Sequence, residues 1–327
     1  MSQSGRRRFL AASGALFAAQ IARTHAQRPD RPFRIGWPIF APLRAARHLV
    51  EAFEAGMRDH GYVVGEDVVL EVRSAEGRVE RYPQVVKEIV ASNPHVIITS
   101  VNMTTDVVKS TTQTIPIVMA IGTDVVAAGY AESLARPGGN ITGITWDVGG
   151  DVTAKALELL REAAPEISRV AVLWEPPYEA NYRAAIDKAA KNFGLATIWL
   201  RYSGDLNKDF VEIRRQRADA MYGLTGARVW ARRSEVVALA AAHRLPATYV
   251  VSEFVDAGGL MSYAPTNTGA FRAVARYVDQ ILRGANPGDL PVEQPARIDL
   301  VINLRAAKAL GLKIPPALLL RADRVIE

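Results

Sequence analysis

Strand-like and helix-like segments alternate along this chain of 327 residues, and this alternation constrains its fold more than any other feature. Short apolar segments predict four strands, at residues 33–37, 68–72, 96–99 and 115–120. Apolar residues at helical spacing predict the intervening helices, at residues 44–60, 81–92 and 104–112. Strands separated by helices indicate a parallel sheet that is covered by helices on both faces.

The same alternation then begins again. The second pass predicts strands at residues 169–174, 196–202, 218–224 and 247–251, with helices at residues 180–193, 209–217 and 229–243. Segments of the two passes are alike, as "FRIGW" and "RVAVLW" or "IPIVMAI" and "LPATYVV" show. The predicted fold class is therefore α/β, with two similar doubly wound parallel-sheet lobes. Such sheets bind ligands outside the carboxyl ends of their strands, so two facing lobes predict a ligand cleft between them.

The segment from Pro116 to Ile144 connects these two passes. Its strand ends in Gly122-Thr123-Asp124, a short helical run follows, and the turn Pro137-Gly138-Gly139 leads into an exit strand at residues 140–145. Small residues at a strand end let a ligand approach, and hydroxyl groups can bind it. The alternative is an ordinary loop, because loops are rich in glycine and proline.

The first 26 residues have the features of an export signal. Arg6, Arg7 and Arg8 precede a mildly apolar stretch, no acidic residue is present, and Ala26 ends a small-residue cleavage site. The paired arginines fit the twin-arginine type of signal. The apolar stretch, residues 9–22, is shorter than the ~20 apolar residues that a membrane-spanning helix needs. We expect cleavage near Ala26 and a location in the periplasm.

Removal of this signal changes the electrostatic character of the chain. The full sequence has a net charge of +6, and the loss of four arginines leaves 36 basic against 34 acidic residues, a net charge of +2. The basic clusters at residues 214–217 and 228–233 have acidic neighbours, so no nucleic-acid surface is expected. The chain has no cysteine, and its fold cannot depend on disulfides.

Motifs that would indicate an enzyme are absent from the sequence. There is no G-x-S-x-G, no G-x-G-x-x-G and no G-x-x-x-x-G-K-[ST]. The histidines after the signal, His48, His60, His95 and His243, lie away from the predicted carboxyl ends of strands and lack metal-ligand spacing. We therefore expect no catalysis, no cofactor and no metal, with a hydrolase on the same fold as a remaining alternative.

Several motifs resemble one known family. "SLARPGGNITGI", "GGLMSYAP", "GYVVGEDVVLEVRSAEG" and the C-terminal segment with "PVEQP" and "GLKIPP" are similar to the substrate-binding proteins of uncharacterised ABC importers. Relatives of that family handle tryptophan and other aromatic amino acids. The resemblance covers about residues 33–327, and it implies the type I periplasmic binding fold.

In that fold the chain crosses between the lobes three times. The resemblance places the crossings near Thr145, Tyr263–Pro265 and Pro291. It implies an N-terminal lobe of residues 27–145 plus 264–290 and a C-terminal lobe of residues 146–263 plus 291–327. The implied partners are a small-molecule ligand and an inner-membrane ABC permease with a separate ATPase. The binding protein itself is expected to be a monomer.

One segment departs from the family pattern. Family members commonly carry Asn-Pro-x-Asn after the first strand of the second lobe, whereas this chain has Trp174-Glu175-Pro176-Pro177-Tyr178. A carboxylate and an additional aromatic ring thus replace an amide, and this difference argues against a standard aromatic amino acid as the solute.

The candidate binding residues of the first lobe follow its predicted strands: Trp37, Ser100, Asn102, Thr104, Thr123 and Asp124. The Trp37 ring could stack on a planar solute, or it could simply pack in the core. Residues 100–104 open a helix whose free N–H groups attract anions, although Asn102 or Thr104 could equally serve as its N-cap. Asp124 could pair with a ligand amine or cap the segment that follows.

The second lobe contributes a further set at its own strand ends: Trp174, Glu175, Tyr178, Asn181, Thr225, Ser252 and Glu253, together with Tyr263 at the second crossing. Any single member could be a packing residue. Together they predict a cleft for a planar or aromatic solute that carries a carboxylate, such as an amino-acid-like molecule. A periplasmic sensor subunit that signals to a membrane kinase would have the same features and remains an alternative. A DNA-binding regulator would need a helix pair where the export signal stands.

Overall fold

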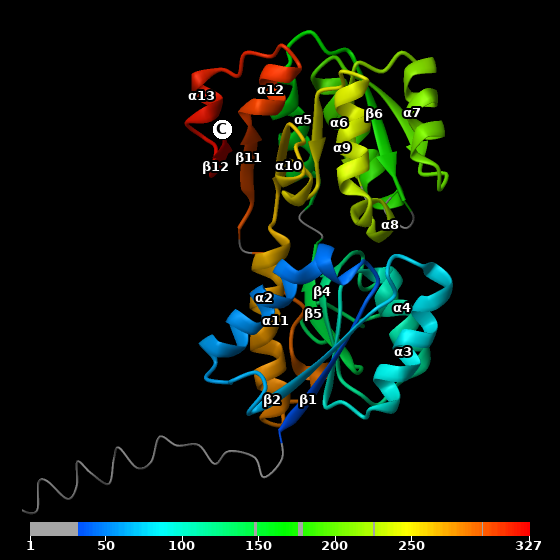
Figure 1. Ribbon diagram of the computed structural model, residues 1–327, viewed down its shortest axis with the longest axis vertical. Coiled ribbons are helices and arrows are strands. Elements are labelled where there is room, and N and C mark those ends of the chain that lie inside the picture. The colour runs from blue at the N-terminus through cyan, green and yellow to red at the C-terminus, as the bar shows by residue number, and fades with distance from the viewer. Residues whose placement is uncertain (1–31, 147–148, 176–178, 225, 296) are drawn as a thin grey trace, which may run out of the picture.

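The computed structural model of this protein describes residues 32–146, 149–175, 179–224, 226–295 and 297–327. Two parallel-dominated sheets, each covered by helices, stand one above the other (Figure 1). We call each sheet with its helices a lobe. The predicted α/β class with two doubly wound lobes is confirmed.

The first lobe is built on a parallel sheet with the order β2-β1-β3-β4-β5. Its strands are β1 (Phe33–Ile39), β2 (Val68–Ser74), β3 (Val96–Thr99), β4 (Ile117–Gly122) and β5 (Ile141–Thr145). Strand β3, Val-Ile-Ile-Thr, is buried along its whole length, as expected for β-branched residues in a parallel sheet covered on both faces.

Helices from distant parts of the chain cover this sheet. They are α2 (Leu43–Asp59), α3 (Tyr82–Ala91), α4 (Asn102–Thr111) and α11 (Asn267–Leu282), with a short 3₁₀ turn η1 (Val79–Arg81). Helix α11 comes late in the sequence and nevertheless packs along α2 at the first sheet (Figure 1). Apolar residues repeat along one side of α2, and Leu49, Phe53 and Met57 are buried there.

The second lobe has a sheet with the order β12-β11-β10-β9-β8-β6-β7, and among its described strands only the β10–β11 pair is antiparallel. Its strands are β6 (Arg169–Trp174), β7 (Ala196–Arg201), β8 (Ala220–Leu224), β9 (Ala247–Tyr249), β10 (Met261–Ala264), β11 (Asp299–Asn303) and β12 (Arg324–Ile326). Its longer helices are α5 (Gly149–Ala163), α6 (Glu179–Asn192), α7 (Leu206–Arg215) and α9 (Arg233–Ala242). The shorter ones are α8 (Ala227–Ala231), α10 (Glu253–Asp256), α12 (Leu304–Ala309) and α13 (Pro316–Leu319).

Three local predictions were wrong. The first strand continues two residues beyond Trp37, so Trp37 lies within the strand. The helix predicted at residues 229–243 is divided at Arg232, whose φ of −106° and ψ of 20° separate α8 from α9. Turns replace the helical run predicted after Asp124, and Gly129 in that segment has a φ of +67°.

The chain crosses between the lobes after β5, after β10 and in the segment that precedes β11 (Figure 1). The third crossing runs beside the first. The N–H of Thr145 donates to Glu293 O at 2.9 Å, and the N–H of Glu293 donates to Gly143 O at 3.0 Å. Gly143 has a φ of +133°, and an added Cβ would lie 2.0 Å from Met119 O, so only glycine fits this strand.

The Pro137-Gly138-Gly139 turn stabilises this arrangement. The N–H of Gly138 donates to Gly288 O at 3.1 Å in the 3₁₀ turn η2 (Pro287–Asp289), and the N–H of Val292 donates to Leu134 O at 2.7 Å. The backbones are so close that a Cβ at Gly288 would lie 2.9 Å from Gly139 O. The turn therefore fixes the segment that leads into the third crossing.

Candidate ligand-binding cleft

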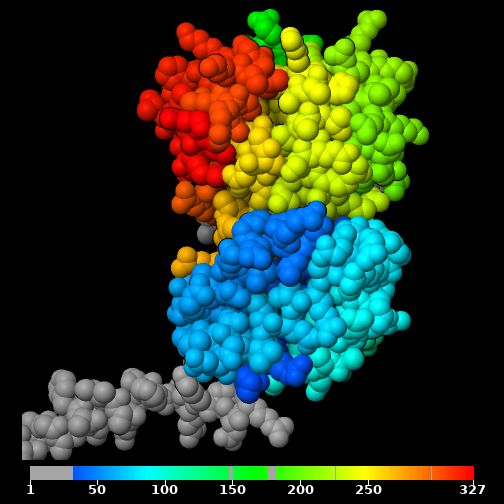
Figure 2. All heavy atoms as spheres, viewed as in Figure 1, coloured from blue at the N-terminus to red at the C-terminus, as the bar shows by residue number. Residues whose placement is uncertain are grey.

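A cavity lies between the two lobes, at the carboxyl ends of strands from both sheets. It contains about 1050 Å³ of space free of protein atoms, part of it open to solvent. Figure 2 shows the first lobe, in blue and cyan, in direct contact with the yellow part of the second lobe on one face of the molecule. Among the described residues, eight aromatic side chains line the cavity: Trp37, Phe40, Trp146, Tyr182, Tyr222, Trp230, Tyr263 and Phe271.

Trp37 is held rigidly in the wall from the first lobe. Its ring stacks on Phe271 of α11 with centroids 4.7 Å apart and planes inclined by 23°. Phe53 of α2 meets it edge-on at 6.0 Å. A chain segment that returns from the second lobe thus supports the β1 tryptophan, and the ring keeps one orientation beside the cavity.

The turn at residues 100–104 lines the cavity, but its side chains serve the fold. Thr104 Oγ1 accepts the N–H groups of Ser100 and Val101 at 3.1 and 3.0 Å, and it donates to Val101 O at 2.7 Å. Asn102 lies behind the wall. Its amide donates to Thr123 O at 2.7 Å and accepts the Thr123 N–H at 2.9 Å. These bonds fix the Gly122-Thr123 strand end against the start of α4.

Trp230 is one of the aromatic residues in the wall from the second lobe, and a polar network positions its helix. The Glu175 carboxylate accepts Arg228 Nε and the Val229 N–H, both at 2.8 Å. The Arg233 guanidinium lies 4.4 Å from the centroid of the Trp230 ring. Trp230 is therefore fixed by the residues on both sides of it in α8 and α9.

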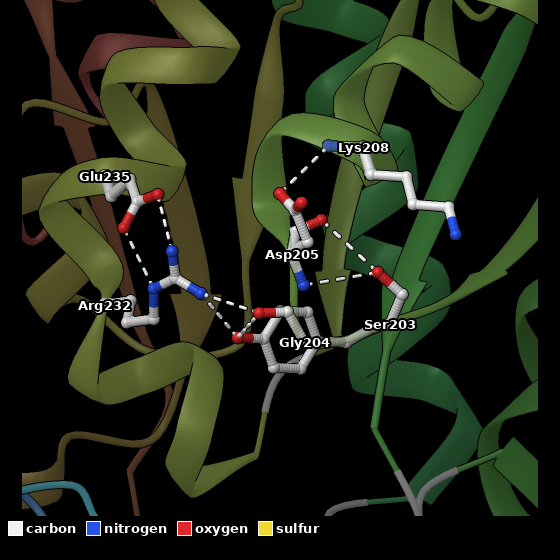
Figure 3. A network of polar contacts seen from close by, with 7 residues as sticks. Ser203, Gly204, Asp205, Lys208, Arg232 and Glu235 are labelled. Carbon is white, nitrogen blue, oxygen red and sulfur yellow. Dashed lines mark hydrogen bonds and ion pairs between the residues drawn. The ribbon is translucent and has the colours of Figure 1, made fainter.

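Figure 3 shows how the junction between α8 and α9 is attached to the end of β7. Arg232 forms an ion pair with Glu235 at 2.6 Å, and its Nη1 donates to the Tyr202 hydroxyl at 2.7 Å and to Gly204 O at 3.1 Å. In the same loop Asp205 caps α7 by accepting the Lys208 N–H. The break at Arg232 thus has a structural cause, because its side chain turns toward this loop.

Four polar atoms of cavity-lining residues are buried without a hydrogen-bond partner among the described residues. They are Trp37 Nε1, Thr123 Oγ1, Trp230 Nε1 and Asn267 Oδ1. Buried polar groups are nearly always hydrogen-bonded in folded proteins. Half of the buried side-chain atoms that lack a partner among the described residues belong to the lining of this one cavity, which favours a bound molecule that supplies the partners.

The described part of the cavity wall contains no Asp, Glu, Lys, Arg or His side chain. Its polar groups are hydroxyls, indole N–H groups, an amide and the backbone. Burial raises the pKa of the Tyr222 phenol above its usual value, so this group stays neutral in the wall.

The structure brings only some of the predicted residues to the cavity. Those that line it are Trp37, Ser100, Thr104, Thr123 and Tyr263. Asn102, Asp124, Trp174 and Glu175 are not part of the lining. Trp174 is buried in the core of the second lobe, with the Arg201 guanidinium 5.9 Å from its ring centroid.

Other predicted residues lie elsewhere. Ser252 and Glu253 line a separate depression, which also contains His48, Asp256 and Arg324. Tyr178 and Thr225 fall outside the described residues, as does the side chain of Asn181.

Sequence reasoning missed several residues of the wall: Trp146, Tyr182, Tyr222, Trp230, Asn267 and Phe271. Trp146 directly follows the predicted exit strand, and Asn267 follows the second crossing by two residues, so position along the chain could have indicated both. Trp230 lay within a predicted helix, where nothing distinguishes an aromatic that faces a cleft from one that faces the core.

Neither a metal site nor a membrane span is found in the part of the chain that the structure describes. There, no three His, Cys, Asp or Glu residues are placed to hold a metal ion. Within the same residues, no helix combines the length and the apolar character needed to cross a bilayer.

Comparison with known proteins agrees with this architecture. The chain is 22% identical over 268 residues to the tyrosine-binding protein of Clostridioides difficile, covering 80% of this chain and 76% of that protein. A conserved domain protein of Vibrio cholerae superposes with a TM-score of 0.82 at 25% identity, over 90% of this chain and 100% of the other. The ABC domain of Streptococcus pneumoniae in complex with L-Trp gives 0.80 at 22% identity, with the same coverage.

The family model described as "ABC transporter substrate binding protein" matches residues 43–326. Members of this family are in general binding proteins that act outside the cytoplasm, and the two-lobed fold is the type I periplasmic binding fold. The chain belongs to the ABC transporter substrate-binding protein family.

Proposed function

We propose that this protein binds a small aromatic solute carrying a carboxylate, in the cavity between its lobes. The closed form would deliver the solute to an inner-membrane permease driven by a separate ATPase. The observation that carries the proposal is the cavity itself: among the described residues, eight aromatic side chains line it, and four polar atoms of its lining residues are buried without a partner. Apolar walls with a few placed polar groups are typical of sites for small organic ligands.

Two features support an aromatic acid as the ligand class. The turn before α4 lines the cavity through Ser100 and Val101, and the positive end of the helix dipole at this place favours an anion. Thr123 adds an unpartnered hydroxyl. The names of two similar proteins, one tyrosine-binding and one in complex with L-Trp, agree with an amino-acid-like solute.

The cell-biological part of the proposal rests on the sequence. Residues 1–26 would act as a twin-arginine signal and be removed near Ala26, so the mature protein would begin near Gln27 in the periplasm. The mature protein would act as a monomer. We divide it into an N-terminal lobe of residues 27–145 plus 264–290 and a C-terminal lobe of residues 146–263 plus 291–327.

A thermal-shift screen of the purified mature protein tests this function. L-tryptophan, L-tyrosine, indole-3-propionate and L-arabinose would each be added to protein freed of bound molecules by unfolding and refolding. A specific ligand at a hundredfold excess over its Kd adds about 2.7 kcal/mol to the free energy of unfolding. Stabilisation by aromatic acids but not by arabinose is expected. Stabilisation by arabinose alone would overturn the proposal.

A further inference from the structure

The unpartnered polar atoms of the cavity come from both lobes and differ in chemistry. Trp37 Nε1 and Trp230 Nε1 are hydrogen-bond donors, and Asn267 Oδ1 is an acceptor. The Thr123 hydroxyl can serve in either role. Trp37 and Thr123 belong to the first lobe, whereas Trp230 belongs to the second.

Elsewhere the chain does satisfy a partly buried indole N–H. Trp199 Nε1, on β7, donates to Asp187 Oδ1 at 2.8 Å. The two cavity indoles have no such partner although both rings are held firmly by their neighbours, Trp37 by Phe271 and Trp230 by Arg233. Rigid, unpaired donors are costly in a folded protein unless a ligand meets them.

The side chain of Asn267 likewise does not serve as the cap of its helix. Asn267 is the first residue of α11, but the cap is the side chain of Thr266, which accepts the Gly269 N–H at 3.2 Å. Asn267 is 3% exposed, and its Oδ1 has no partner among the described residues. This acceptor is therefore available for a donor group of a ligand.

We propose that these atoms select the solute, an inference that rests on the proposed function. The indole N–H groups of Trp37 and Trp230 and the Thr123 hydroxyl donate hydrogen bonds to the carboxylate of an aromatic acid. Asn267 Oδ1 accepts a hydrogen bond from an N–H or O–H group of the same molecule. No charged side chain of the described wall neutralises the carboxylate, so neutral donors hold it. Because Trp230 lies on the second lobe, its hydrogen bond forms only when the lobes meet, and recognition of the acid favours closure.

Isothermal titration of the mature protein with matched ligands tests this assignment. Indole-3-propionate carries the ring and the carboxylate, whereas 3-methylindole carries the ring alone. Trp230→Phe and Thr123→Val each remove one donor and keep an apolar group. We expect each variant to lower the affinity for indole-3-propionate by about 10-fold or more, because one hydrogen bond to a charged group is lost. The affinity for 3-methylindole should fall by less than about 3-fold.

A second ligand pair examines the acceptor. L-tryptophan has an ammonium group that indole-3-propionate lacks. Asn267→Ala should therefore lower the affinity for L-tryptophan by about 10-fold more than the affinity for indole-3-propionate. The control is Trp199→Phe, which alters an indole outside the cavity and should leave all affinities unchanged. Trp37→Phe is the analogous change in the first lobe. Trp37 is wholly buried, so Trp230→Phe and Thr123→Val decide the question if that variant does not fold.

The outcomes separate the two levels of the proposal. Suppose that the wild-type protein binds aromatic ligands, but Trp230→Phe and Thr123→Val lower the affinities for indole-3-propionate and 3-methylindole equally. The donor assignment is then wrong, and the proposed function stands. If the wild-type protein binds none of these indoles, both are overturned. Selective loss of the acid in both variants supports the assignment.

Discussion

The carboxylate of Glu175 accepts the guanidinium Nε of Arg228 at 2.8 Å, joining the end of β6 to the start of α8. The Glu175 side chain is 4% exposed and that of Arg228 is 37% exposed. The same carboxylate accepts the Val229 N–H, one residue before Trp230. A residue that the sequence suggested as a ligand contact therefore positions a wall of the cavity instead.

This relationship predicts that Glu175→Ala weakens ligand binding from outside the cavity. Loss of the carboxylate leaves the Val229 N–H and Arg228 without their acceptor, which should lower the free energy of unfolding by about 1–3 kcal/mol. Affinity for the aromatic solute should fall as well, because α8 no longer fixes Trp230. Urea unfolding and calorimetric titration measure the two effects. The matched control is Glu212→Ala, which removes an exposed ion pair with Arg215. Normal affinity in Glu175→Ala would contradict the positioning role.

The exit strand of the first lobe should tolerate no side chain at position 143. In Gly143→Ala the added Cβ meets backbone atoms of Met119, and the φ of +133° disfavours alanine, so we expect destabilisation of more than about 3 kcal/mol or failure to fold. Gly139→Ala is the control, because a Cβ there would meet nothing within 4 Å. Denaturant midpoints would show the difference, and equal midpoints for the two variants would contradict the prediction.

Alkaline titration should reveal a phenol at the third crossing. Tyr277 is buried and donates to Pro291 O at 3.0 Å, and burial is the main cause that raises its pKa to about 12. A raised phenol pKa means that the neutral form is favoured by folding. The resulting stability is present below pH ~10, the usual pKa, and is lost as the pH rises through about 12.

Absorbance of the phenolate band measures this titration. Tyr277→Phe should remove one group that ionises near pH 12, and it should lower the free energy of unfolding by about 1 kcal/mol through the lost hydrogen bond. The pKa values of Tyr82 and Tyr249 are raised by complete burial, so these residues should ionise only on unfolding. Ionisation of every tyrosine near pH 10 in the folded protein would refute this assignment.

Binding of the solute should shift the protein toward the arrangement seen in the structure, in which the two lobes are in contact. Direct contacts already join them, with Arg233 Nη2 donating to Ala45 O at 3.1 Å and His48 Nε2 lying 3.4 Å from Glu253 Oε1. We expect the hinge at residues 145–147, of which residue 147 lies outside the described residues, and at residues 263–265 and 291–293, because a few linker residues can absorb a change in φ and ψ. Small-angle scattering should give a smaller radius of gyration with saturating ligand. An identical curve with and without bound ligand would exclude closure as the response.

Export should depend on the paired arginines. In cells that express the full chain with Arg6→Lys and Arg7→Lys, we expect the precursor to remain in the cytoplasm, because twin-arginine signals require these residues. Fractionation and mass measurement of the N-terminus would show this, with the unmodified chain, for which we expect cleavage near Ala26, as the control. Unchanged export of the double variant would indicate another route.

The sequence by itself determined the fold class and the general place of the site. Strands at residues 96–99 and 169–174 were predicted with the bounds that the structure shows, because continuous apolar runs between helical segments have few other interpretations. The strand-end rule then led to Thr123, since every parallel strand of a sheet ends at the same edge. Trp37 was selected as a strand end as well and lines the cavity, although its strand continues to Ile39.

Tertiary structure decided which side chains face the cavity. Successive residues of a strand point to opposite faces, and Trp174, at the end of its strand, packs in the core of the second lobe. The tryptophan of this lobe that lines the cavity is instead Trp230, on helix α8. Glu175 turned toward Arg228 because a buried carboxylate needs a partner. Phe271 and Asn267 reached the cavity only because the chain returns to the first lobe after β10. Contacts between segments so distant in sequence arise from the packing of the whole chain, which local patterns of apolar and polar residues do not encode.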